Sequence, residues 1–313
     1  MATKKQKVFI TGAGGFLGSH ICDAFLEQGY AVFGAIRKDD SRVGHLRGDK
    51  DFKTVSLDFT NEKETAEILA DISPDAVVHA GALNPKEPIA SPFPYLEANE
   101  RGTLSVFEAA RKANVLKFIY ISSMSVYDKS KPTLSVSETH PVSPNDFYSV
   151  SKYAGETWAR LYGEYLGMQV TVLRCSGIYG ERRHFGSVYN FVTHALAHKP
   201  LVIDRDVGWD LVSVKDVAEA VVQSCQMLDC RTFEVLNIGS GVETKIEELA
   251  NLVIRESDSR SKIVCAPDSK KKPPFHFYFD ISKARELLGF EPATLQKGIR
   301  AYIKILKVEP HST

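Results

Sequence analysis

Tyr148 and Lys152 are the two residues whose types and spacing best suit proton transfer. They are four residues apart in a predicted helix, residues 146–156, so their side chains share one face. A phenol with a pKa of roughly 10 is a poor base at neutral pH unless a nearby positive charge favours the phenolate, and the Lys152 ammonium supplies that charge. The pair could therefore exchange a proton with a bound molecule. A solvated surface pair is the alternative.

Three serines, Ser122, Ser123 and Ser125, follow the apolar run at residues 118–121, which predicts a buried strand. Ligands of open α/β sheets bind beyond the carboxyl ends of the strands, so these hydroxyl groups are placed to meet a ligand. We expect Ser123 to hydrogen-bond the reacting oxygen of a substrate. A turn or helix cap is the alternative explanation of the serine cluster.

Three glycines, Gly12, Gly15 and Gly18, stand between the apolar run at residues 8–10 and a segment with helical spacing. A glycine-rich turn between a strand and a helix is typical of dinucleotide binding. Gly12 permits the tight turn, Gly15 lets the backbone approach a pyrophosphate, and Gly18 allows close packing of helix on strand. The N–H groups at the helix N-terminus attract the anion. An ordinary strand-to-helix turn is the alternative.

The end of the second predicted strand indicates which nicotinamide dinucleotide is favoured. An acidic residue there would bond the ribose 2′-hydroxyl of NAD, but this chain has Ile36 followed by Arg37 and Lys38. A guanidinium favours a 2′-phosphate, so the sequence predicts NAD(P) as cofactor, with NADP preferred. Asp39 or Asp40 could accept the ribose hydroxyl instead, which leaves NAD open.

The elements that must position these residues follow from alternating patterns. Short apolar runs lie at residues 8–10, 31–33, 54–57, 76–78, 118–121 and 170–173, with helical spacing between them. This alternation predicts an α/β fold of Rossmann type, a doubly wound parallel sheet with helices on both faces. Asn61 with Glu64 is a predicted capping box for a helix ending near Ile72. Thr244 with Glu247 is predicted to open a helix in the same way.

The pattern changes after residue 175 to mixed short strands and helices. We expect a Rossmann domain that binds NAD(P) at residues 1–175. Residues 176–313 are predicted to form mainly a smaller, mixed α/β substrate-binding region, with some segments returning to the Rossmann domain. At 313 residues, one large domain with a smaller appendage is the natural expectation.

The composition is that of an ordinary globular protein, with 43% hydrophobic and 25% charged residues. Lys and Arg together number 39, as do Asp and Glu, so no charge excess indicates a nucleic-acid partner. No apolar stretch is long enough for a signal peptide or a membrane span, so we expect a cytoplasmic protein with no membrane partner. The five cysteines lack metal-ligand spacing and are expected to be reduced, with no metal bound.

Together these motifs resemble the extended short-chain dehydrogenase/reductase family, which includes NAD-dependent epimerase/dehydratase enzymes acting on nucleotide sugars. Ser123, Tyr148 and Lys152 match its catalytic residues. The resemblance covers essentially the whole chain and includes the segments at residues 209–218, 237–241 and 280–284. The cofactor-binding residues that it implies are Gly12, Gly15, Phe16, Leu17, Gly18, Arg37, Asp58, Phe59, Ala80, Gly81, Ala82, Asn99, Tyr148, Lys152 and Ile178.

The residues expected to bind substrate lie around this triad, and several positions depart from the family's pattern. The substrate-binding candidates are Asn84, Lys86, Ser123, Ser125 and Arg182. Met124 and Ser125 replace the Asp-Glu pair of the family's dehydratases, so dehydration is not expected. Gly177 replaces an asparagine that reaches the substrate diphosphate in the family, and Lys272 with Pro273 replaces an Arg-Pro pair.

The resemblance implies NAD(P)(H)-dependent hydride transfer at a secondary alcohol or ketone carbon of a sugar nucleotide, by an epimerase or ketoreductase. Gly177 keeps open an NADPH-dependent reductase of a non-nucleotide carbonyl compound. A non-catalytic dinucleotide-sensing protein is the remaining alternative, and the intact triad argues against it. By analogy with the family we expect a homodimer, formed through predicted helices at residues 95–113 and 146–167.

Overall fold

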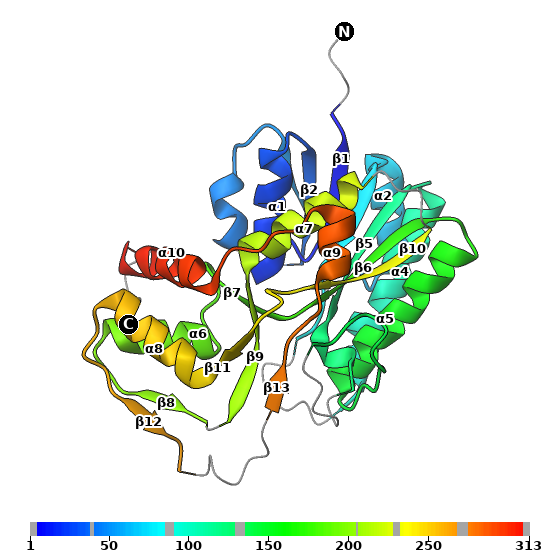
Figure 1. Ribbon diagram of the computed structural model, residues 1–313. Helices are drawn as coiled ribbons and strands as arrows, with labels where there is room; N and C mark the ends of the chain where they lie inside the picture. The colour runs from blue at the N-terminus through cyan, green and yellow to red at the C-terminus, as the bar shows by residue number, and fades with distance from the viewer. Residues whose placement is uncertain are drawn as a thin grey trace.

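The computed structural model of the protein describes residues 5–37, 41–84, 91–128, 135–204, 206–227, 232–267 and 275–308. Most of these residues belong to a large sheet with helices on both faces, and a smaller region lies beside it (Figure 1). Six residues named in the sequence analysis fall outside the described residues: Lys38, Asp39, Asp40, Lys86, Lys272 and Pro273.

Seven parallel strands form the large sheet in the order β10-β6-β5-β4-β1-β2-β3. They are β1 (Lys7–Thr11), β2 (Ala31–Ile36), β3 (Phe52–Ser56), β4 (Ala76–His79), β5 (Lys117–Ser123), β6 (Gln169–Cys175) and β10 (Phe233–Ile238). The six apolar runs predicted as strands contribute to β1 through β6. The strand order reverses between β1 and β4, and a ligand crevice is expected at this point.

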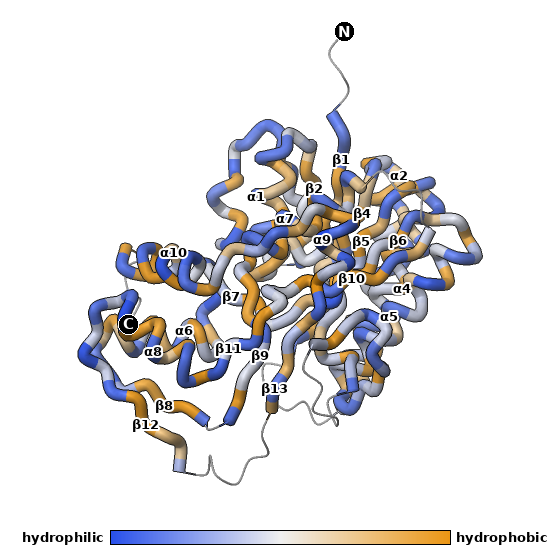
Figure 2. The backbone as a smooth tube through the Cα atoms, in the orientation of Figure 1, coloured by the Kyte–Doolittle hydropathy of each residue, from blue (hydrophilic) through white to orange (hydrophobic). Residues whose placement is uncertain are grey.

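Helices cover both faces of the sheet, which confirms the predicted Rossmann-type α/β fold. One face carries α1 (Phe16–Glu27), α7 (Val214–Gln226) and α9 (Ser282–Leu288). The other carries α2 (Glu62–Ile72), α4 (Gly102–Lys112) and α5 (Phe147–Glu164). Apolar residues run along the strands between these two helical layers (Figure 2).

Asn61 caps the N-terminus of α2, as the sequence predicts, because its side chain accepts a hydrogen bond from Glu64 N–H. The predicted box at Thr244 and Glu247 is wrong by one residue. Lys245 precedes the helix, and its N–H bonds to the Glu248 carboxylate at 3.3 Å. Thr244 instead lies in a strand that pairs with Trp209.

The smaller region is built from the second half of the chain (Figure 1, lower left). Its helices are α6 (Ser187–Leu196), α8 (Ile246–Ser257) and α10 (Leu295–Val308), which share an apolar core. Its strands are β7 (Gly177–Tyr179), β8 (Leu201–Ile203), β9 (Val207–Ser213), β11 (Glu243–Lys245), β12 (Ile263–Cys265) and β13 (Phe275–Phe277). Both parallel and antiparallel pairs occur among them.

The remaining short helices lie in the connections of the Rossmann region: η1 (Ser41–Leu46), α3 (Phe93–Tyr95), the π-helix η2 (Leu96–Arg101) and η3 (Met124–Val126). Cys22, Cys175 and Cys225 are buried free thiols and Cys265 is an exposed one, whereas Cys230 lies outside the described residues. Within the described ranges, no helix is long and apolar enough to span a membrane. No cluster of three or more potential metal ligands occurs there either.

Candidate active site

Ser123 and Tyr148 are brought together at the carboxyl end of the sheet. Ser123 is the last residue of β5, and Tyr148 lies in the first turn of α5. Asp146 fixes the start of this helix, because its carboxylate accepts a hydrogen bond from Ser149 N–H at 2.7 Å. The Tyr148 and Ser123 hydroxyl groups share a hydrogen bond. Ser123 and Tyr148, which are 25 residues apart in the sequence, are therefore in contact in the structure.

Lys152 lies one helical turn after Tyr148 and is almost fully buried. Its Nζ stands 4.2 Å from the centroid of the Tyr120 ring, in a cation–π contact. Burial lowers the pKa of Lys152 to about 7, because the ammonium loses hydration. Burial likewise raises the pKa of Tyr148 to about 12, and the hydrogen bond from Ser123 opposes this effect. A charge that binds beside Lys152 or Tyr148 would therefore change the protonation state of that side chain.

A glycine cradle faces the crevice between β1 and β4. A Cβ at Gly12 would lie 2.7 Å from Gly81, and a Cβ at Gly18 would lie 2.0 Å from the Gly12 carbonyl oxygen. No side chain caps the N-terminus of α1, where Gly15 is the N-cap. Anions favour such an open helix N-terminus. The shape and chemistry of the turn therefore fit a dinucleotide pyrophosphate.

The cradle continues into a cleft of about 280 Å³. The cofactor-binding candidates that line it are Gly12, Gly15, Arg37, Asp58, Phe59, Gly81 and Ala82. Candidates outside its lining are Phe16, Leu17, Gly18, Ala80, Asn99, Tyr148, Lys152 and Ile178. Gly18 lies behind the turn, against Gly12, whereas Phe16 begins α1. The cleft thus brings together the ends of β2, β3 and β4.

Arg37 is exposed at the rim of the cleft, directly after the buried Ile36. Asp58 also lines the cleft, and its carboxylate accepts hydrogen bonds from the N–H and the hydroxyl of Thr60. The described residues that end β2 include no carboxylate. This arrangement is compatible with a 2′-phosphate, and the preference for NADP stays a prediction.

Two buried polar residues, Asn99 and His79, stabilise the segments around the site through hydrogen bonds. Asn99 bonds both the N–H and the carbonyl of Leu83, and its Nδ2 donates to the Ser151 hydroxyl at 2.9 Å. His79 links the Thr11 and Thr103 hydroxyl groups, at 2.7 and 2.9 Å. Burial lowers the pKa of His79 to about 3, so this ring is neutral. Both residues hold backbone segments in place.

Arg42 contacts the glycine-rich turn and was missed by the sequence analysis. It donates hydrogen bonds to the carbonyl oxygens of Gly14 and Arg182, at 3.3 and 3.4 Å. It thereby joins the glycine-rich turn to the loop that follows β7. In that loop the Arg183 guanidinium lies 5.4 Å from the Phe16 ring centroid and donates to the Ile178 carbonyl. The loop therefore closes against the start of α1.

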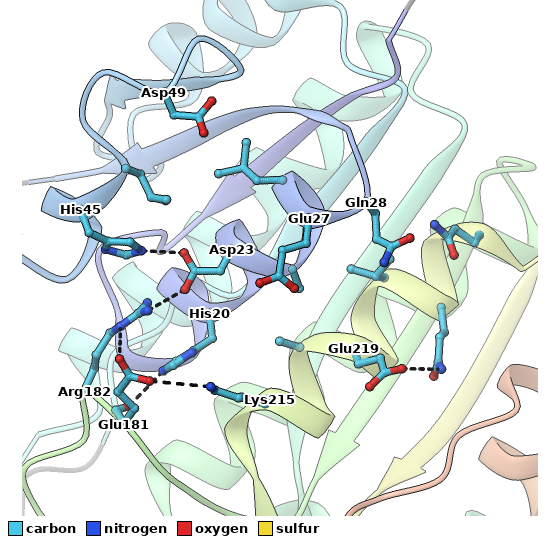
Figure 3. Close-up of a pocket in the computed structure, with 17 residues that line it drawn as sticks. His20, Asp23, Glu27, Gln28, His45, Asp49, Glu181, Arg182, Lys215 and Glu219 are labelled. Carbon is cyan, nitrogen blue, oxygen red and sulfur yellow. Dashed lines mark hydrogen bonds and ion pairs between the residues drawn. The ribbon is translucent and has the colours of Figure 1, made fainter. Parts of the chain in front are cut away.

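Arg182, a substrate-binding candidate, faces a groove of about 960 Å³ between α1 and α7 (Figure 3). Its guanidinium forms an ion pair with Asp23 at 2.6 Å, and Asp23 also meets His45 at 2.7 Å. His20 bonds the Glu181 carbonyl oxygen at 3.0 Å. These contacts fasten the loop after β7 to the Rossmann region. A substrate contact by Arg182 stays a prediction.

The other substrate-binding candidates lie close to the triad or at its margin. Ser125 follows Ser123 by two residues and is buried, and its hydroxyl has no hydrogen-bond partner among the described residues. Asn84 is exposed after β4. Gly177 packs so closely that a Cβ would lie 2.8 Å from the Asp210 carbonyl oxygen. A larger residue at position 177 would therefore have to displace β9.

A pocket of about 210 Å³ lies beside Gly177 in the smaller region. Aromatic side chains dominate its walls: Tyr179, Phe185, Tyr189, Trp209 and Tyr302. Arg183 is the cation in its lining, and its guanidinium stacks on Phe185 at 4.5 Å. This pocket also includes Ile178, so it adjoins the residues predicted to contact the cofactor.

The whole chain has structural and sequence relatives among UDP-sugar epimerases. The structure of a UDP-glucose 4-epimerase from Thermotoga maritima with UDP-glucose superposes with a TM-score of 0.84, at 26% identity, covering 96% of this chain and 99% of that one. A UDP-glucuronic acid 4-epimerase from Bacillus cereus in complex with NAD gives 0.83 at 27% identity, with the same coverage. A putative UDP-glucose 4-epimerase from Methanocaldococcus jannaschii is 28% identical over 308 residues, covering 96% of this chain and 98% of that protein.

A family model matches residues 8–239, which include the glycine cradle, the triad and most of the large sheet. This match confirms the resemblance drawn from the motifs. The chain belongs to the NAD dependent epimerase/dehydratase family.

Proposed function

We propose that the protein is an enzyme that transfers a hydride between NAD(P) and a secondary alcohol or ketone carbon of a nucleotide-activated sugar, as an epimerase or a ketoreductase. The hydrogen bond between Ser123 and Tyr148, with Lys152 one turn further along α5, is the observation that carries this proposal. The relatives named as UDP-glucose and UDP-glucuronate 4-epimerases support the substrate class.

The chain's own residues have distinct tasks in this reaction. Tyr148 takes the proton from the substrate hydroxyl during oxidation and returns it during reduction. Ser123 orients the same oxygen, and Ser125 offers a further buried hydroxyl to the sugar. Lys152 as an ammonium favours the Tyr148 phenolate and hydrogen-bonds the nicotinamide ribose. The bound nicotinamide supplies the hydride acceptor or donor.

The identity of the cofactor separates the two forms of this enzyme. The Ile36 and Arg37 end of β2 favours NADP and an exchanging reductase. The structures of the Bacillus cereus enzyme and of a Bordetella bronchiseptica enzyme contain NAD, which supports an epimerase that keeps its cofactor. A cofactor that is regenerated in each cycle gives epimerisation, and one that exchanges gives net reduction or oxidation.

A second candidate is reduction of a non-nucleotide carbonyl compound. The packing of Gly177 against β9 leaves no side chain there for a substrate diphosphate. The adjoining pocket, with Trp209 and Tyr189 in its walls, is suited to a flat apolar ring. We further propose a homodimer formed through α4 and α5.

Two measurements on the purified protein test the proposal. Dinucleotide released on denaturation is identified first, and NADH and NADPH are then titrated by nicotinamide fluorescence. Tightly held NAD supports the epimerase, whereas reversible binding with NADPH preferred supports the reductase. UDP-glucose and UDP-glucuronate are assayed beside simple ketones to separate the two substrate classes.

Tyr148→Phe is expected to lower turnover by about 10²- to 10⁴-fold while dinucleotide affinity stays near that of the wild type, because the phenol acts in proton transfer. Tyr153→Phe is the matched control, since Tyr153 is on the same helix and exposed. Full activity of Tyr148→Phe would overturn the assignment of Tyr148 as proton donor and acceptor.

A further inference from the structure

The reactive face of α5 continues one turn beyond Lys152 to a buried carboxylate. Tyr148, Lys152 and Glu156 are spaced by four residues, so they lie along one stripe of the helix. Glu156 is 4% exposed. The proton transfer by Tyr148 gives Glu156 no role. A buried carboxylate is nevertheless strongly unfavourable unless it is paired, so its presence on this face requires an explanation.

Glu156 is held in a fixed position by partners from two strands. The Arg174 guanidinium on β6 donates to its carboxylate through Nη2 at 2.6 Å and Nε at 3.0 Å. The Ser122 hydroxyl on β5 donates to it at 2.5 Å. Arg174 is itself held by the Tyr127 ring, 4.6 Å away, and by the Glu138 carbonyl oxygen. Ser122 and Arg174 therefore leave the Glu156 carboxylate little freedom to move.

Titratable groups from four elements face Lys152. Tyr148 and Glu156 come from α5, Tyr120 from β5, His79 from β4, and Cys175 from β6. Burial raises the pKa of the Cys175 thiol to about 12 and lowers that of His79 to about 3, so both are neutral near pH 7. Tyr120, fully buried, is neutral as well, because burial raises its pKa. Glu156 is the carboxylate in this set, and its charge opposes the effect of burial on the ammonium.

We propose that Glu156 is a positioning residue whose fixed carboxylate, one helical turn from Lys152, keeps the buried lysine side chain in its ammonium form. Arg174 and Ser122 set the place of that carboxylate, and Arg174 partly offsets its charge. The role rests on the proposed function, because the ammonium is the form that favours the Tyr148 phenolate and can bond a ribose. Glu156 itself does not touch the substrate.

Two substitutions that break the same ion pair test this role by the direction of their effects. Glu156→Gln removes the negative charge and is expected to lower the pKa of Lys152 by roughly one. Arg174→Met leaves the carboxylate uncompensated and is expected to raise that pKa by a similar amount, roughly one. A merely structural ion pair would not shift the pKa in opposite directions when broken from either side.

The measurement is a pH titration of the lysine Nζ signals by NMR on the ¹⁵N-lysine-labelled full chain without added dinucleotide. Lys152→Arg identifies the Lys152 signal by its loss, and circular dichroism establishes that each variant is folded. Glu156→Asp, which retains the charge, is the control: the pKa of Lys152 in this variant is expected to lie closer to the wild-type value than in Glu156→Gln. No substrate is needed, so failure of the proposed reaction would leave these shifts unaltered.

Opposite shifts in the two variants support the role of Glu156. Equal pKa values in all folded variants, or shifts of the same sign, overturn it. Where Glu156→Gln does not fold, Arg174→Met decides the matter by itself, because an unchanged or lowered pKa of Lys152 in that variant contradicts the proposal.

Discussion

Asp210 is a fully buried carboxylate that joins four separate segments of the chain. Its Oδ1 accepts hydrogen bonds from the Ser176 hydroxyl and from the N–H and hydroxyl of Ser240. Its Oδ2 accepts from the N–H groups of Gly241 and Phe279. All these partners donate, so the site is built for an acceptor with two oxygen atoms. Asp210 thereby fastens the strands of the smaller region to the end of the large sheet.

Asp210→Asn is expected to lower the free energy of unfolding by about 2–3 kcal/mol, because the amide Nδ2 would face buried N–H donors and leave them unpaired. Urea unfolding followed by circular dichroism measures the change. Ser176→Ala is the control, since it removes one donor and is expected to lower the free energy of unfolding by about 1 kcal/mol. An Asn variant as stable as the wild type would contradict this account of Asp210.

Single residues were predictable from sequence where a short motif fixes their geometry. Tyr148 and Lys152 share a helical face because a four-residue spacing guarantees it, and Ser123 was placed by the end of a strand. Arg42 and Arg182 were not predictable in the same way. They meet through Arg42 Nε and the Arg182 carbonyl oxygen, 140 residues apart in sequence, and no local pattern records that contact.

Elements were predictable where capping or hydrophobic periodicity is strong. Asn61 caps α2, and the helix ends at Ile72 as expected. Thr244 was wrongly predicted to open α8 because threonine is a frequent N-cap. In the structure Thr244 pairs in β11, and Lys245 is the residue that precedes the helix. The π-helix η2 within the predicted helix at residues 95–113 has no signature in the pattern of apolar residues.

The junction of β1 and α1 depends on Gly18 having no side chain. A Cβ there would lie 2.0 Å from the Gly12 carbonyl oxygen, which is backbone and cannot swing aside. Gly18→Ala is therefore expected to displace the turn and to weaken NADH or NADPH binding by at least about 10-fold, because close backbone approach to the pyrophosphate is lost. Fluorescence titration of the folded variant measures the affinity.

Gly44→Ala is the matched control for Gly18→Ala. A Cβ at Gly44, in the 3-10 helix after β2, meets no atom within 4 Å, so this variant should bind dinucleotide like the wild type. Loss of binding in both variants would indicate a general effect on folding. Unchanged affinity in Gly18→Ala would show that the turn tolerates the displacement.

The whole molecule interleaves the two halves of the chain more closely than a division at residue 175 implies. Strand β10 completes the large sheet beside β6, and α7 packs against α1, although both come from the second half. Local patterns in a sequence cannot specify such returns, because tertiary packing decides which segments become partners. For that reason the sequence analysis could expect some segments of residues 176–313 to return to the Rossmann domain but could not say which ones.

An apolar surface on α5 and the neighbouring helix bears on assembly. Phe147 and Val150 are 45% and 46% exposed and lie three residues apart on one face of α5. Phe93 in α3 and Leu96 in η2 are 69% and 43% exposed, and both helices pack against α5. Clustered apolar side chains on a surface mark an interaction site more often than scattered ones.

Val150→Glu is expected to convert the proposed dimer to a monomer, because a carboxylate would be buried without a partner at an isologous interface. Sedimentation velocity over a range of concentrations measures the change. Val242→Glu is the control, since Val242 is 62% exposed in the turn between β10 and β11 and lies outside α4 and α5. If Val150→Glu stays dimeric, or if the wild type is already a monomer, the apolar surface on α5 is not the dimer interface. A monomeric variant that still binds dinucleotide would show that the cofactor cradle forms within a single chain.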